Sequence, residues 1–148
     1  MNSHPFWRAY MAGSIVPTVF MLVVLAGFVI IRIVLQAPAP FERILVFPLA
    51  LAPNLFGIWN VFYQRLAKWR SFPIGVHGAI LPLVMAPLAY ALARGLGYAV
   101  PTATGLEWFG LIRETYGEAG FGIVAAVCVY YFVWKYIVDF FNRTLGIA

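Results

Sequence analysis

Residues 14–36 read SIVPTVFMLVVLAGFVIIRIVLQ, an apolar run whose only charged residue is Arg32. The hydrocarbon core of a bilayer is about 30 Å thick, so a spanning helix needs about 20 mostly apolar residues. Four runs of the chain meet that length, at residues 14–36, 44–66, 73–93 and 119–138. We therefore expect an all-α integral membrane protein, a four-helix bundle formed as a single domain over residues 1–148.

The overall composition agrees with this class. The 148 residues are 64% hydrophobic and only 10% charged, and their mean hydropathy is +0.89. A soluble domain carries about 25% charged residues because its surface must face water, so this composition excludes an ordinary soluble fold. The first run is long for a signal peptide, and Pro40 follows the small residues 37–39, so we expect an uncleaved first span.

Basic residues give the chain a formal net charge of +5 and cluster beside the ends of the runs. This pattern is typical of membrane topology, and we expect no nucleic-acid partner. The break RLAKWR at residues 65–70 has three cations and no anion, and cytoplasmic loops of membrane proteins are enriched in Lys and Arg. We therefore expect both termini on the cytoplasmic side, in a bacterial inner membrane.

The second run contains an unusual number of polar side chains. At 100° per residue, Asn54, Gly57, Asn60 and Gln64 fall within an arc of about 120° on one helix face. An amide in lipid is costly without a partner, so this face is expected against another helix or water. Two interpretations stay open, a packing surface and a transport pathway that the run's prolines help to shape.

The third run has small residues at steps of three or four, from Gly75 and Gly78 to Ala89, which permits close helix packing. His77 lies about one turn inside the end of this run. Because a short break joins the second and third runs, we expect His77 near Asn60 and Gln64. A structural histidine, a proton-relay residue and a haem or metal ligand are the three interpretations of His77.

The longest break lies between the third and fourth runs, at residues 95–118. Its apolar residues Leu106, Phe109 and Ile112 recur at steps of three, and Thr104 precedes them as a candidate N-cap. This spacing predicts a short interfacial helix over residues 106–113, with a lid over an entrance as the alternative. The fourth run contains Cys128, expected to be a small buried hydrophobe.

Three classes of function remain. The scarcity of ionisable residues within the runs favours a structural or accessory subunit that assembles with itself or with other membrane proteins. A small oligomeric channel or transporter would instead use the face of Asn54, Asn60, Gln64 and His77. A lipid-, quinone- or haem-binding protein is the third class. We find no set of catalytic or metal-ligating residues, so we expect no enzyme, no cofactor and no metal, and the lipid bilayer as the surrounding partner.

Overall fold

The computed structural model describes residues 4–36, 41–66 and 71–147, without the side chains of residues 41–50. The fold is mostly helical. Among the described residues, three helical segments are long and apolar enough to cross a membrane, at Pro5–Val34, Ile74–Gly95 and Tyr116–Thr144. The second run also forms a helix, α2 (Phe41–Arg65), and its crossing of the membrane stays a prediction. Lys68 and Arg70 of the basic break lie outside the described residues.

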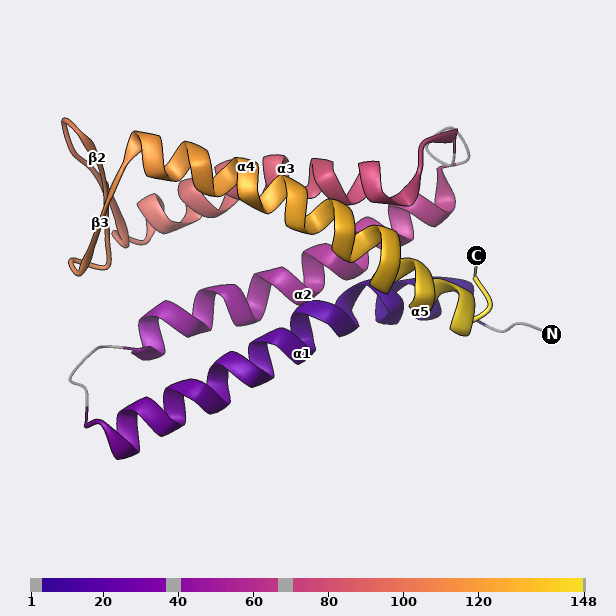
Figure 1. The fold of residues 1–148 in the computed structure, drawn as a ribbon, viewed down its shortest axis with the longest axis horizontal. Helices are drawn as coiled ribbons and strands as arrows, with labels where there is room; N and C mark the ends of the chain where they lie inside the picture. The colour runs from indigo at the N-terminus through magenta and orange to yellow at the C-terminus, as the bar shows by residue number, and fades with distance from the viewer. Residues whose placement is uncertain (1–3, 37–40, 67–70, 148) are drawn as a thin grey trace. The chain divides into compact units, whose positions relative to one another are not determined.

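The chain forms two compact units. Unit 1 comprises Met1–Lys68 together with Ile137–Ala148, and unit 2 comprises Trp69–Tyr136. In unit 1, α1 (Pro5–Val34) and α2 lie side by side as an antiparallel hairpin (Figure 1). The short helix α5 (Asp139–Thr144) packs against α1 in the same unit.

Two glycines bring α1 and α2 into close contact. A Cβ placed on Gly13 of α1 would lie 2.5 Å from the carbonyl oxygen of Phe56 in α2, and one placed on Gly57 of α2 would lie 2.5 Å from the ring of Tyr10. Real Cβ atoms do not approach so closely, so a larger residue at Gly13 would have to displace the backbone of α2 and one at Gly57 the ring of Tyr10. Small residues at such positions are how helices pack closely in lipid, where dispersion contacts supply much of the attraction.

Unit 2 contains a second helical hairpin, formed by α3 (Ile74–Gly95) and α4 (Tyr116–Phe132), which lie side by side in Figure 1. Gly75 of α3 faces Tyr131, and Gly78 faces Trp134 in the π-helical turn η2 (Val133–Val138) that continues α4. The small-residue stripe of the third run therefore packs against large aromatic side chains. A helix with no Cβ at these positions leaves room for a ring.

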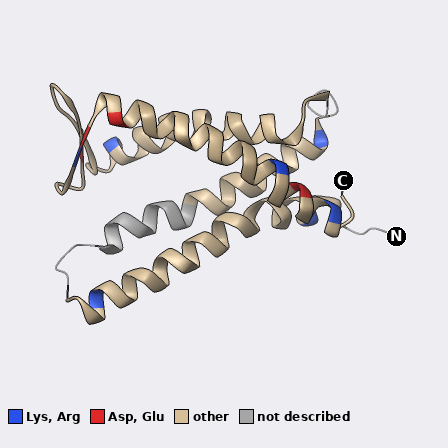
Figure 2. Cartoon of the chain, in the orientation of Figure 1, with Lys and Arg blue, Asp and Glu red and all other residues tan. Residues whose placement is uncertain are grey.

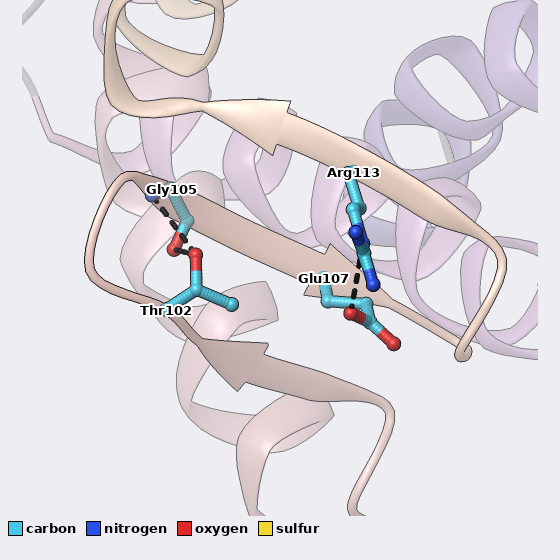
Figure 3. A network of polar contacts seen from close by, with 4 residues as sticks. All are labelled: Thr102, Gly105, Glu107 and Arg113. Carbon is cyan, nitrogen blue, oxygen red and sulfur yellow. Dashed lines mark hydrogen bonds and ion pairs between the residues drawn. The ribbon is translucent and has the colours of Figure 1, made fainter.

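The segment between α3 and α4 is a three-stranded antiparallel sheet of order β1-β2-β3, formed by β1 (Ala99–Pro101), β2 (Gly105–Trp108) and β3 (Ile112–Thr115). Figure 3 shows a polar contact between two neighbouring strands and another in a turn of the sheet. Arg113 Nε donates to Glu107 Oε2 at 3.2 Å. Thr102 Oγ1 accepts from the Gly105 amide at 3.1 Å and donates to the Gly105 carbonyl at 3.0 Å, which closes the turn between β1 and β2.

The sheet corrects the prediction of a short interfacial helix over residues 106–113, and with it the all-α description. Phe109 and Gly110 both adopt left-handed backbone angles, with φ of 58° and 70°, which make the tight turn joining β2 to β3. The step of three residues that suggested a helix is broken at this turn. Thr104 begins no helix, whereas Thr115 caps α4, since its Oγ1 accepts from the Glu118 amide at 3.2 Å. The expectation that Cys128 is buried was also wrong, because Cys128 is exposed on α4.

The charged residues that the structure describes lie in the sheet and toward the ends of the helices, while the middle stretches of the described helices are free of them (Figure 2). In unit 1, Arg32 lies in the last turn of α1, whereas Arg65 lies in the last turn of the antiparallel α2, at the opposite end of the hairpin. In unit 2, Arg94 lies in the last turn of α3 and Glu118 in the first turn of α4. This distribution matches the cost of placing charges in hydrocarbon.

Candidate functional site

A pair of asparagine side chains forms the most buried polar contact described in unit 1. Asn60 of α2 and Asn142 of α5 are both 0% exposed. Asn60 Nδ2 donates to Asn142 Oδ1 at 2.7 Å, and Asn142 Nδ2 donates back to Asn60 Oδ1 at 3.2 Å. The two amides thus satisfy each other reciprocally, which is how buried polar groups avoid the cost of losing water.

The same amide also binds α1. Asn60 Nδ2 donates its second hydrogen to the backbone carbonyl of Ala9 at 2.7 Å, so both donors of the Asn60 amide are used. Ala9 and Ala12 are fully buried, and Gly13 lies against the Cβ of Asn60. These small residues let the amide reach the backbone of α1. One side chain therefore connects three helices.

The C-terminal segment has a second attachment to α1. Arg8 Nη1 donates to the carbonyl oxygen of Leu145 at 3.3 Å. Helix α5 ends in a glycine motif, in which Gly146 has a φ of 65° and the Ile147 amide donates to the Asn142 carbonyl at 2.9 Å. This motif satisfies the last carbonyls of the helix and fixes the direction of the chain where Arg8 binds it.

The other two amides of the polar face of α2, Asn54 and Gln64, are less buried than Asn60. Asn54 is exposed, and its Oδ1 accepts a hydrogen bond from the hydroxyl of Tyr10 in α1. The ring of Tyr10 covers Gly57. Both contacts join α2 to α1, so Asn54, Gly57 and Asn60 of the predicted polar face all contact α1.

Gln64 and His77 complete the predicted set. Gln64 is half-buried in the last turn of α2. His77 is 2% exposed in α3 of unit 2, with its ring edge-on to that of Phe72 at 6.4 Å between centroids. Asn54, Asn60 and Gln64 thus belong to unit 1 and His77 to unit 2. The cluster of His77 with Asn60 and Gln64 stays a prediction.

Asn142 and Tyr10 are the partners that sequence reasoning missed. The predicted fourth span ends at residue 138, but the helical segment continues through η2 and α5 to Thr144. The polar residues after Val138 resemble a solvated tail. The sequence offered one signal: Asn142 lies four residues after Val138 and therefore on the same face of a continuing helix. In the structure both side chains are fully buried.

The chemistry of this site is that of neutral amides. Amide side chains donate and accept hydrogen bonds but do not titrate near neutral pH, so Asn60 and Asn142 can hold helices together and cannot act as acid or base. In the described ranges, no group of three or more His, Cys, Asp and Glu residues is placed to hold a metal ion.

Comparison of the chain with protein-family models, with curated proteins and with solved structures finds no match.

Proposed function

We propose that the chain is a structural or accessory subunit of a membrane assembly, in which its copies associate with one another or with other membrane proteins. The observation that supports this role best is the engagement of Asn60. Its side chain is 0% exposed and spends both donors inside unit 1, on Asn142 and Ala9. A polar group used in this way strengthens a scaffold and offers nothing to a permeating ion or solute.

We further propose that the scaffold is a four-helix membrane bundle with both termini on the cytoplasmic side. The bond from Arg8 to the Leu145 carbonyl supports a shared side, because it joins the first turns of α1 to the C-terminal segment of the chain. The basic residues favour the cytoplasmic side for this end of unit 1, because segments on that side are enriched in Lys and Arg. Three arginines lie near the two termini or the basic break, namely Arg8 of α1, Arg65 of α2 and Arg143 of α5.

The surface of α1 supports the same proposal. Only a few of its residues are buried in the fold, and its large apolar side chains remain exposed over the second half of the helix. In a bilayer such a surface faces lipid tails or another protein. The most exposed of these residues are Phe20, Leu22, Val23, Ile30, Ile33 and Val34.

The test measures two quantities, the mass of the particle extracted from the membrane and the ion flux through the protein in liposomes. The protein is extracted from its membrane in polymer-bounded nanodiscs, which retain neighbouring subunits, and its mass is measured by native mass spectrometry. We expect particles heavier than the single chain of 16.5 kDa. The same protein in liposomes, loaded with a fluorescent reporter of Na⁺, K⁺ or H⁺, is expected to give no flux above empty liposomes.

Two results would contradict the proposal. One is a particle that contains a single chain and no other protein. The other is ion flux that the wild type supports and that Asn60→Leu abolishes, while the control Gly27→Ala, at a position of α1 with nothing within 4 Å of the added Cβ, leaves the flux unchanged. That second result would favour the channel or transporter, which uses the same residues as a pathway.

A further inference from the structure

Three arginines from three helices lie at one end of unit 1. The guanidinium carbon of Arg65, in the last turn of α2, lies 4.0 Å from the ring centroid of Phe6 in α1. Two residues after Phe6, Arg8 donates to the carbonyl of Leu145. Two residues before Leu145 is Arg143, in the last turn of α5. This chain of contacts places the three positive charges around the first turns of α1.

Arg65 and Arg143 keep guanidinium donors for a further acceptor. Among the side chains that the structure describes in unit 1, Asp139 is the one carboxylate, and it pairs with Arg143 at 2.7 Å. The Arg143 side chain is 74% exposed. Because water screens so open an ion pair, Asp139 neutralises the charge of Arg143 only weakly. Arg65 is held by a ring, which leaves the edges of its planar guanidinium available for oxygen acceptors.

The neighbouring side chains set the depth of this cluster. Arg65 follows Asn60 by five residues, about 7.5 Å along the axis of α2, so the arginines stand just beyond the buried amide pair. Trp7, which is 66% exposed, lies beside Arg8 in sequence and packs edge-on to Tyr10. Exposed tryptophan next to arginine at the end of an apolar helix is typical of the headgroup region of a bilayer.

We propose that Arg8, Arg65 and Arg143 form a binding site for the phosphate headgroup of an anionic phospholipid. Arginine binds phosphate oxygens through paired N–H donors, and clusters of cations beside membrane spans attract anionic lipids. The acyl chains of the lipid then lie along the exposed apolar surface of α1. The site adds a ligand to the chain and does not depend on the assembly role proposed above.

The experiment titrates the protein, purified in a neutral detergent, with phosphatidylglycerol or phosphatidylcholine and counts bound lipids by native mass spectrometry. We expect tighter binding of phosphatidylglycerol, weakened by added salt. Arg65→Gln and Arg143→Gln should each weaken it about fivefold, the effect of one cation near an anionic surface. These two variants are preferred because Arg8 also binds the backbone of the C-terminal segment.

Arg113→Gln is the matched control, since Arg113 is an exposed arginine that pairs with a carboxylate, as Arg143 does, but in the sheet of unit 2. It should leave lipid binding unchanged. Equal binding of the two lipids, or an equal loss in the Arg113 variant, would overturn the proposal. A competition with inorganic phosphate distinguishes a lipid headgroup from free phosphate as the ligand. If free phosphate displaces the lipid at equal concentration, the site is a phosphate site and the lipid assignment is wrong.

Discussion

Removing the amide pair of Asn60 and Asn142 should destabilise unit 1 by an amount that follows from its hydrogen bonds. Asn60→Leu keeps the side chain's size and loses three bonds, two with Asn142 and one to the Ala9 carbonyl. Hydrogen bonds between helices in a bilayer average about 0.6 kcal/mol each. We therefore expect Asn60→Leu to lower the free energy of unfolding by about 2 kcal/mol, and Asn142→Leu, which loses two bonds, by about 1 kcal/mol.

The double variant gives the sharper result. Both single variants remove the same two bonds, so Asn60→Leu with Asn142→Leu should cost about 2 kcal/mol, the same as Asn60→Leu alone. The difference from additivity, about 1 kcal/mol, measures the pair itself. The unfolding free energy is measured by titration with a denaturing detergent in mixed micelles, followed by tryptophan fluorescence.

A matched cycle provides the control. Asn54 bonds to Tyr10 and shares no hydrogen bond with Asn142, so Asn54→Leu combined with Asn142→Leu should be additive. If the cycle of Asn60 with Asn142 is also additive within about 0.3 kcal/mol, the two amides are not coupled. The account of Asn60 as the residue that joins α5 to the hairpin would then be refuted.

Three other substitutions test separate parts of the fold. Gly13→Ala should destabilise the hairpin, because its Cβ would press on the backbone of α2, whereas Gly27→Ala, with nothing within 4 Å, should be neutral or slightly stabilising in the same unfolding titration. Thr115→Ala should cost about 1 kcal/mol by removing the N-cap of α4, and fraying of its first turn should appear as faster amide hydrogen exchange at Glu118. Gly110→Ala, at a φ of 70°, should cost about 1 kcal/mol of backbone strain; an unchanged stability would contradict the turn described between β2 and β3.

The helices were predictable because hydrophobic length is a local property. The run at residues 14–36 lies almost wholly within α1. The run at residues 73–93 begins one residue before α3 and ends within it. The helical wheel also selected Asn60 as a polar residue that must face a partner. The identity of that partner was not predictable, since Asn142 is 82 residues away in the sequence.

The sheet between α3 and α4 shows the limit of periodicity. Leu106, Phe109 and Ile112 have helical spacing, but the left-handed backbone at Phe109 and Gly110 turns the segment into two paired strands. In a window of only eight residues, the helical period of about 3.6 residues and the strand period of about two residues give similar patterns of apolar side chains. Pairing with β1 then favours strands, because it satisfies backbone groups of β2 on both edges.

By itself the amino-acid sequence determined that this protein has helices able to span a membrane, because the free energy of placing a segment in lipid depends on its own length and composition. Only the tertiary structure decided which residues meet. It placed Gly75 and Gly78 against Tyr131 and Trp134, and it used Asn60 to hold the C-terminal helix. Such contacts depend on how close two backbones can approach, and that distance is set jointly by residues far apart in the chain.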